Sequence, residues 1–203
     1  GGRVDDLDRW TYVPTWRSSP RAIRDEAAAL REAGPWLVLA AEPRGVQVAE
    51  HLRRLGADVT LAQVRGRAGG SPPGDAIGAV AGEVVDPATA AADLESLLRA
   101  APQLPRVVVH AGALGDPTDG LAPTDALLPG YRIALALVTA VNTVSPGTDV
   151  DLLALTDTAT AFGDVSPGSS AQAALAALLP VLAQENPGWV CRHIDIGTGL
   201  PVP

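Results

Sequence analysis

The sequence predicts an α/β fold built on a doubly wound, mostly parallel β-sheet. Short apolar runs alternate with segments of helical spacing along nearly the whole chain, which is the pattern of successive strand and helix units. Several of these runs are continuously apolar, as expected for parallel strands buried on both faces. With 203 residues, 47% of them hydrophobic and 19% charged, the chain has the composition of one globular domain. The outline is Rossmann-like.

Strands are expected where a short apolar run lies between turn-forming residues. The run at 36–40, Trp-Leu-Val-Leu-Ala, is apolar throughout. Residues 65–82 are rich in Gly, Ser, Pro and Arg, so we expect a surface loop there that leads into a short strand near 82–85. The remaining strands are expected at 58–61, 106–110, 149–155 and 189–195.

Helices are expected between the strands. Residues 22–33 are rich in Ala and end at Gly34, and residues 44–55 place apolar side chains at helical spacing before Gly56. The later helices are expected over 90–101 with Thr89 as the N-cap, over 124–143, and from a cap at Ser169 or Ser170 to about Glu185.

Residues 1–20 are expected to form an N-terminal docking segment, separate from a Rossmann-like body at 21–203. Trp10, Tyr12 and Trp16 alternate with polar residues, which is typical of an edge or docking strand. The chain begins without Met and shows no secretory signal pattern, so we expect an internal piece of a longer protein.

Charge and cysteine content limit the expected partners and location. A net charge of −8 and a pI near 4.7 oppose binding to nucleic acid. No apolar run reaches the roughly 18 to 20 residues of a membrane span, because the stretch 168–183 is interrupted by Gln172 and Pro180. The single cysteine, Cys191, excludes an intramolecular disulfide and is compatible with a reducing compartment. We expect a cytoplasmic protein that binds neither nucleic acid nor membranes.

The chain contains no lysine, since all of its basic residues apart from histidine are arginine. Schiff-base chemistry, the lysine of phosphate-binding loops and the Tyr-x-x-x-Lys pair of short-chain dehydrogenases all require this residue. These reaction classes are therefore excluded for this chain.

The turn after the first strand is not expected to bind a dinucleotide. Such a turn needs glycines that let a pyrophosphate reach backbone N–H groups at the start of the helix. The segment 40–46 has one glycine, Gly45, and Glu42 adds a negative charge. Arg65 and Arg67 follow the second strand, where arginine often binds the 2′-phosphate of NADPH, but in a Gly-rich loop they are expected to be solvated.

The histidines are expected to have structural roles. His110 ends a strand before a glycine turn, which resembles a strand-end motif of short-chain dehydrogenases, but no acid is positioned to orient it. His51 is expected to be solvated, and His193 to be packed or paired within its strand. No further ligands lie at a spacing that suggests a metal site.

Serine, threonine and cysteine are not expected to act as nucleophiles. Thr156 and Thr158 follow a strand at the place where short-chain dehydrogenases keep a catalytic Ser. The Tyr that should come about a dozen residues later is absent, and Ser169 and Ser170 suit a helix cap instead. Cys191 is expected to be buried, and no Gly-x-Ser-x-Gly elbow is present. We predict no catalytic residue.

Segments from both ends of the chain match the sequence pattern of one known family. They are the strand that ends in His110, Trp10-Thr-Tyr12 with Trp16, Gly82-Glu83 to Asp86-Pro87, Ser170-Ala-Gln-Ala-Ala-Leu175, Gln184-Glu-Asn-Pro187 and Cys191-Arg192-His-Ile-Asp195. On these segments the chain resembles the structural subdomain of modular type I polyketide synthase ketoreductases, and the similarity covers nearly all 203 residues.

The resemblance implies one half of a two-part enzyme. In that family the first Rossmann-like half has lost cofactor binding and braces the second. The second half binds NADPH and uses Ser, Tyr and Lys to reduce a β-ketoacyl group on an acyl carrier protein. This chain resembles the first half and ends at Pro203, where the second half or an inserted domain is expected to begin. No catalytic, cofactor-binding or metal-binding residue is therefore inherited.

The implied partners are the catalytic half, neighbouring synthase domains and, indirectly, the acyl carrier protein. Trp10, Tyr12 and Trp16 are implied to dock on the catalytic half, with packing in the local core as the alternative for Trp16. Two other functions stay open. One is a degenerate ketoreductase that organises neighbouring methyltransferase or enoylreductase domains. The other is a self-contained NADPH-dependent short-chain oxidoreductase with unusual catalytic groups.

Overall fold

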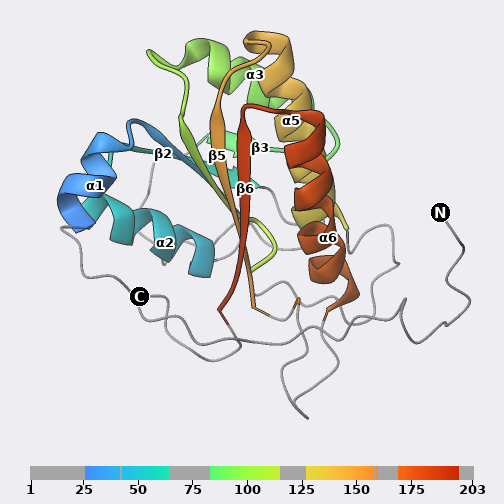
Figure 1. The fold of residues 1–203 in the computed structure, drawn as a ribbon. Coiled ribbons are helices and arrows are strands. Elements are labelled where there is room, and N and C mark those ends of the chain that lie inside the picture. Colours follow the sequence, from blue (N-terminus) through green and yellow to red (C-terminus); the bar gives the residue numbers. More distant parts are fainter. Residues whose placement is uncertain are drawn as a thin grey trace, which may run out of the picture.

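A parallel β-sheet lies at the centre of the computed structural model, with helices on both faces (Figure 1). The structure describes residues 26–41, 43–64, 83–114, 127–157, 159 and 169–196. Within these ranges the strand order is β3-β2-β1-β4-β5-β6, and all neighbouring strands are parallel. The strands are β1 (Trp36–Ala40), β2 (Val59–Val64), β3 (Glu83–Val85), β4 (Val107–Ala111), β5 (Val150–Thr156) and β6 (Trp189–Asp195).

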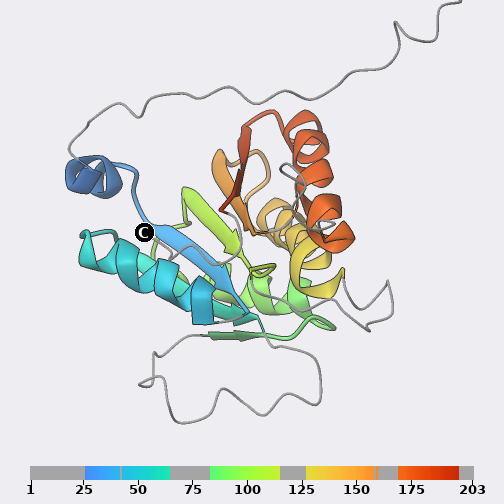
Figure 2. The ribbon, with the colours of Figure 1, turned by 90° about the horizontal axis from the view of Figure 1, so that it is seen from below.

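Helices cover the sheet in two layers (Figure 1 and Figure 2). The α2 face carries α1 (Glu26–Glu32) and α2 (Pro43–Arg54), and the α6 face carries α3 (Ala90–Ala100), α5 (Ile133–Val144) and α6 (Ser170–Glu185). A π-helical turn, η2 (Leu128–Arg132), leads directly into α5. None of the helices in the described ranges is long and apolar enough to cross a membrane. The layers confirm the predicted α/β fold with a doubly wound parallel sheet.

The central strands are packed on both sides, as their continuous apolar runs predict. In β1, Leu37 and Leu39 belong to the core of the α6 face, whereas Val38 belongs to the core of the α2 face. In β4, Val108 and Val109 divide between the two cores in the same way. Every residue of both strands is buried, so the sheet depends on both helix layers for its stability.

Glycine ends the first two helices, as predicted. Gly34 follows α1 with φ of 88°, and Gly56 follows α2 with φ of 92°. Side chains with a Cβ rarely adopt this left-handed conformation, so glycine stops the helix at low cost. The second strand extends to Val64, three residues beyond the predicted end at 61, because Ala62 and Val64 pack in the core and pair with β3.

The helix predicted over 124–143 begins differently in the structure. Its first turn in the described ranges is η2, in which the Arg132 N–H donates to the Leu127 carbonyl. Gly130 lies close to the end of β4, since a Cβ at this position would meet the Ala113 Cβ at 3.3 Å. Apolar spacing predicts a helix here but does not distinguish this wider turn from a regular one.

The predicted N-caps are at the right positions, but one of them acts differently. Ser169 accepts the Gln172 N–H at 3.4 Å, which confirms the cap of α6. Thr89 precedes α3, yet its hydroxyl donates to the Asp93 carboxylate at 2.8 Å rather than accepting from the backbone. Asp93 also accepts the Asp86 N–H at 2.9 Å, so this carboxylate ties the helix start to the preceding turn.

Some predicted features lie outside the described residues. They include the docking residues Trp10, Tyr12 and Trp16, the loop at 65–82, and the first residues of two predicted helices, 22–25 and 124–126. The docking role of the three aromatic side chains and the division at residue 20 therefore stay predictions.

Gly45, in the first turn of α2, lets the helix approach the sheet closely. A Cβ at this position would meet the Ala40 Cβ at 2.8 Å and the Ala111 Cβ at 3.2 Å. Close packing of helix on strand is one of the three roles of glycine in a dinucleotide-binding turn. This role is retained, although residues 41–44 contain no other glycine.

Replacing Gly45 with alanine is expected to lower the free energy of unfolding by between about 1 and 3 kcal/mol, because α2 must shift away from β1 and β4. Gln47→Ala, on the exposed side of the same helix, is the control and should change it by less than about 0.5 kcal/mol. Urea unfolding measures the free energy of unfolding of both variants. Equal stabilities would show that close packing at Gly45 is dispensable.

Candidate functional site

The carboxyl ends of β1, β4 and β5 lie along one edge of the sheet, here called the carboxyl edge. The winding of the chain reverses between β1 and β4, because β2 and β3 lie on one side of β1 and the later strands on the other. Ligands of open α/β sheets bind at such a switch point, outside the strand ends. The residues that follow these strands are therefore the first candidates for a functional site.

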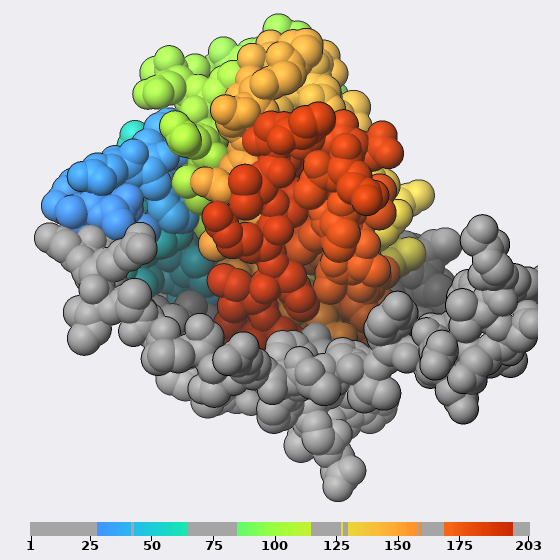
Figure 3. Space-filling model, viewed as in Figure 1, coloured from blue at the N-terminus to red at the C-terminus, as the bar shows by residue number. Residues whose placement is uncertain are grey.

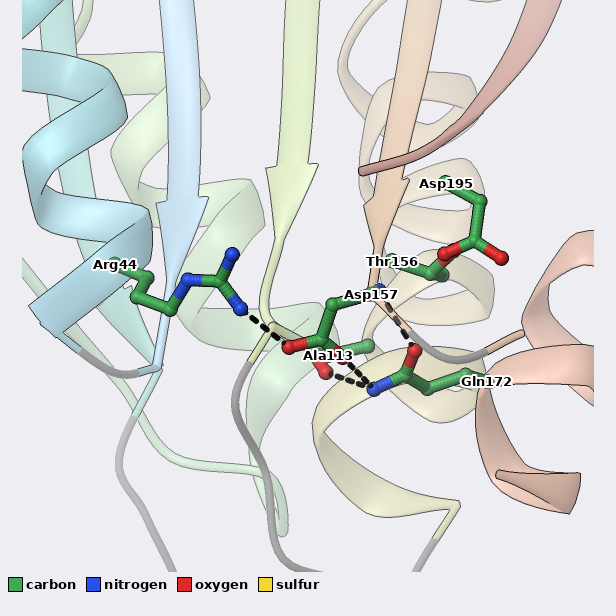
Figure 4. Close-up of polar contacts among 6 residues, drawn as sticks. All are labelled: Arg44, Ala113, Thr156, Asp157, Gln172 and Asp195. Carbon is green, nitrogen blue, oxygen red and sulfur yellow. Dashed lines mark hydrogen bonds and ion pairs between the residues drawn. The ribbon is translucent and has the colours of Figure 1, made fainter. Parts of the chain in front are cut away.

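An ion pair crosses the carboxyl edge at the switch point. Arg44, in the first turn of α2, extends past the end of β4 toward Asp157, which directly follows β5 (Figure 4). The Arg44 NH1 atom lies 2.6 Å from Asp157 Oδ2, and the two side chains are 25% and 6% exposed. The positive charge at the start of α2 is thus matched by a carboxylate of the chain itself.

Gln172 of α6 completes what we call the switch-point network of Arg44, Asp157 and Gln172. Its Oε1 accepts the Asp157 N–H at 2.9 Å, and its Nε2 donates to Asp157 Oδ1 at 2.7 Å and to the Ala113 carbonyl at 2.8 Å. The side chain is almost fully buried. It therefore connects the turn after β4 to the residue after β5 and orients the carboxylate that Arg44 binds.

The sequence patterns assign no role to the three residues of this network. Each has a local signal: Arg44 starts the helix after the first strand, Asp157 directly follows the fifth, and Gln172 lies in the Ser-Ala-Gln segment that resembles the ketoreductase family. No pattern of spacing brings them together, because their contact depends on the order of the strands in the sheet.

His110, at the end of β4, is fully buried and neutral. Its Nε2–H donates to the Gly130 carbonyl at 2.8 Å, and its Nδ1 accepts the Gly112 N–H at 3.4 Å. Desolvation lowers the pKa of the ring below its ordinary value of 6.5, and the bond to Gly130 opposes part of this change. Both ring nitrogens bond within the fold, which agrees with the predicted structural role.

Thr156, His193 and Asp195 form a second polar cluster, where β5 and β6 end. The Thr156 Oγ1 atom lies 2.7 Å from His193 Nε2 and donates to Asp195 Oδ1 at 3.1 Å, so the imidazole Nε2–H donates to the hydroxyl. Burial lowers the pKa of His193, and the charge of Asp195 opposes part of that change. Thr156 is fully buried, so it joins the two strands, and the predicted pairing of His193 within the fold is confirmed.

Cys191 and His51 both have side chains of intermediate burial. Cys191 is half-buried rather than buried, because it lies on the edge strand β6. Burial raises the pKa of its thiol above the ordinary value of 9.0, which disfavours the reactive thiolate. His51 is partly exposed to solvent, and Arg54 NH2 lies 3.4 Å from its Nδ1. The expectations that lie outside the described residues concern Glu42, Arg65, Arg67 and Thr158.

The polar groups described at the carboxyl edge are directed at other parts of the chain. Across the described ranges, no three His, Cys, Asp or Glu residues gather as they would around a metal ion. A hollow of about 230 Å³ lies beside Asn186 and Trp189, at the start of β6 and thus at the opposite edge of the sheet. The switch-point network neutralises the charges of Arg44 and Asp157 and holds these side chains in place at the carboxyl edge.

Breaking the Arg44–Asp157 pair is expected to destabilise the fold. Arg44→Gln or Asp157→Asn should lower the free energy of unfolding by about 2 kcal/mol, less than for a fully buried pair because Arg44 is partly exposed. Arg99→Gln removes the exposed pair with Glu95 and is the matched control, expected to cost less than about 0.5 kcal/mol. Denaturant unfolding measures the free energy of unfolding of these variants and of the control. A cost no larger than that of the control would contradict the stabilising role.

The low pKa of His110 predicts a loss of stability in mild acid. The unfolded chain takes up the proton near pH 6.5 and the folded chain only at lower pH. The contribution of His110 to the free energy of unfolding should therefore be fully present well above pH 6.5 and be lost as the pH falls through 6.5 toward the lowered pKa. His110→Gln should flatten part of this slope, and His193, whose pKa is also lowered, should keep the rest. Chemical unfolding at a series of pH values measures how the free energy of unfolding changes with pH. This dependence must differ between the wild type and His110→Gln.

The similarity of this chain to known proteins lies in its fold. No protein-family model matches the chain, and no curated protein matches its sequence. Among solved structures it is similar to a SCOR enzyme of Clostridium thermocellum, with a TM-score of 0.54 and 15% identity over 80% of this chain and 70% of that one. It is also similar to a short-chain dehydrogenase of Mycobacterium avium, with a TM-score of 0.52 and 20% identity over 80% of this chain and 67% of that one.

For the aldohexose dehydrogenase of Thermoplasma acidophilum the TM-score is 0.52 and the identity 11%, over 79% of this chain and 65% of that one. The chain thus spans slightly less than two thirds of the length of that dehydrogenase. At such identities the likeness extends to the arrangement of strands and helices and no further. The chain has the Rossmann-like fold of short-chain dehydrogenases and reductases.

Proposed function

We propose that this chain is the non-catalytic structural half of a polyketide synthase ketoreductase. It braces a separate catalytic half, which binds NADPH and reduces the β-ketoacyl group carried by an acyl carrier protein. The observation that supports this role most strongly is the Arg44–Asp157 ion pair. The pair crosses the switch point, where a dinucleotide lies in enzymes with this kind of sheet.

Both space and charge at the carboxyl edge oppose a bound cofactor. A pyrophosphate binds to backbone N–H groups at a helix start and needs glycine for its close approach. Gly45 is used here for packing against Ala40 and Ala111. The Arg44 guanidinium at the helix start is paired with the Asp157 carboxylate, so an incoming diphosphate would have to displace a nearly buried charge from its donors.

Two further features oppose ketone reduction by this chain, one in its sequence and one in the part of the chain that the structure describes. The chain has no lysine for a Tyr-x-x-x-Lys pair. Thr156, at the end of β5, is fully buried and bonded to His193 and Asp195, so its hydroxyl is not available to a substrate. The proposal therefore assigns NADPH and the catalytic Ser, Tyr and Lys to the other half.

A bracing half needs a surface for its partner. Large exposed apolar side chains in the described ranges are 40–48% exposed and lie on α5, α6 and the edge strand β6, namely Leu135, Val181, Val190 and Ile194. In Figure 3, α6 and β6 form one continuous surface beside α5. Trp189 and Cys191 pack on the α6 face, so Val190 and Ile194, which alternate with them, lie on the other face of β6. We assign the contact with the catalytic half to the edge strand β6 together with the predicted docking segment 1–20.

Titration of the purified chain with NADPH tests the proposed function. We expect no saturable binding up to about 1 mM, which is the upper end of usual Michaelis constants. A complete ketoreductase titrated alongside shows that the assay detects binding. Micromolar affinity of the chain for NADPH or NADP⁺ would overturn the proposal and favour the self-contained oxidoreductase.

A further inference from the structure

We infer that the outward sides of α5 and α6 form a contact surface for a second copy of this chain. The two helices lie side by side on the α6 face of the sheet (Figure 1 and Figure 2). This surface, here called the α5–α6 surface, lies on the opposite side of the sheet from Val190 and Ile194. It is therefore separate from the contact that we assign to the catalytic half.

The outward side of α6 is uncharged and mostly apolar along its length. Val181 is its most exposed large apolar residue, with 47% of its surface accessible. A helix on the surface of a protein usually carries charged residues on its outward side, so a side of this kind indicates contact with another protein. Partly or fully exposed residues recur here at the spacing of one helix side, namely Ala173, Ala176, Ala177, Pro180, Val181 and Gln184.

The absence of charge from both helices favours a second copy as the partner. Residues 133–144 and 170–184 contain no Asp, Glu, Arg or His, whereas α3, on the same face, carries Asp93, Glu95 and Arg99. With a net charge of −8, two copies repel each other where their acidic surfaces meet. In a twofold dimer a surface meets its own copy, so a charge near the axis would oppose itself. A surface without charge is complementary to itself.

The polar groups on the outward side of α5 are already bonded within the chain. The Thr139 hydroxyl donates to the Leu135 carbonyl at 3.0 Å, and the Thr143 hydroxyl donates to the Thr139 carbonyl at 2.8 Å. Asn142 Nδ2 donates to Asn186 Oδ1 at 3.0 Å, just beyond the end of α6. Because these donors keep their partners in a contact, covering them with another protein costs little.

The size of the α5–α6 surface is sufficient for a weak dimer. α6 has 16 residues and α5 has 12, so the helices are about 24 Å and about 18 Å long. With a width of about 12 Å each, they present roughly 500 Å² per copy, and a dimer would bury about 1,000 Å². This area is at the lower limit for a specific interface, so we expect a dissociation constant on the order of 10 μM.

Sedimentation equilibrium of the 203-residue chain, from well below to well above this concentration, tests the inference. We expect a reversible equilibrium between monomer and dimer. Val181→Glu places a charge on the α5–α6 surface and should raise the dissociation constant at least about tenfold, because the charge is desolvated or meets its like. Leu135→Glu, on α5, should do the same.

Val190→Glu is the matched control. Val190 is 48% exposed, almost as Val181 is, but it lies on β6. The control therefore adds the same charge to an equally exposed valine, and it should leave the dissociation constant unchanged. Circular dichroism and the melting temperature show that each variant is folded. If Val181→Glu does not fold, Leu135→Glu provides the same test from the other helix.

A chain that stays monomeric at all concentrations overturns the inference. A dimer that both α5–α6 variants leave intact, or that Val190→Glu weakens equally, also overturns it, because another surface then makes the contact. The same holds if the chain is monomeric and Val181→Glu instead blocks its association with a separately purified catalytic half. In that case the α5–α6 surface belongs to the catalytic half and not to a second copy.

Discussion

The ion pair between Arg44 and Asp157 joins the two parts of the sheet that lie on either side of the switch point. Arg44 belongs to α2, which packs on β1, and Asp157 follows β5, so their contact passes the end of β4. Through Gln172 the same contact links helices from opposite faces. On an open surface such a pair contributes little, but an almost buried carboxylate is costly without its partner. The conformation of the carboxyl edge follows from this requirement.

In an enzyme of this fold, the same strand ends would direct their polar groups at a ligand. In this chain they bond to one another: His110 donates to the Gly130 carbonyl, and Thr156 donates to Asp195. Polar groups that are satisfied within the protein stabilise the edge that carries them. In the bracing role that we propose, these internal bonds take the place of the bonds that a cofactor makes in an enzyme of this fold.

Local sequence signals were sufficient for the elements of the fold but not for the site. The run at 36–40 predicted a strand because a parallel strand buried on both faces is apolar at consecutive positions. Gly34 and Gly56 marked helix ends because they adopt positive φ readily. The Arg44–Asp157 pair could not be predicted, since it depends on which strands lie side by side. The π turn η2 was missed because it has the same apolar spacing as a regular helix.

β1 lies at the centre of the sheet but leaves the ribosome long before its second neighbour. β1 pairs with β2 on one side and with β4 on the other, so that Trp36 pairs with both Val59 and Val107. β2 is the next strand in the chain, but β4 is synthesised much later. During that interval a wholly apolar strand presents unpaired N–H and C=O groups, which can pair with a strand of another molecule. The topology therefore adds a hazard of aggregation in the growing chain to the one that the edge strand β6 presents in the folded protein.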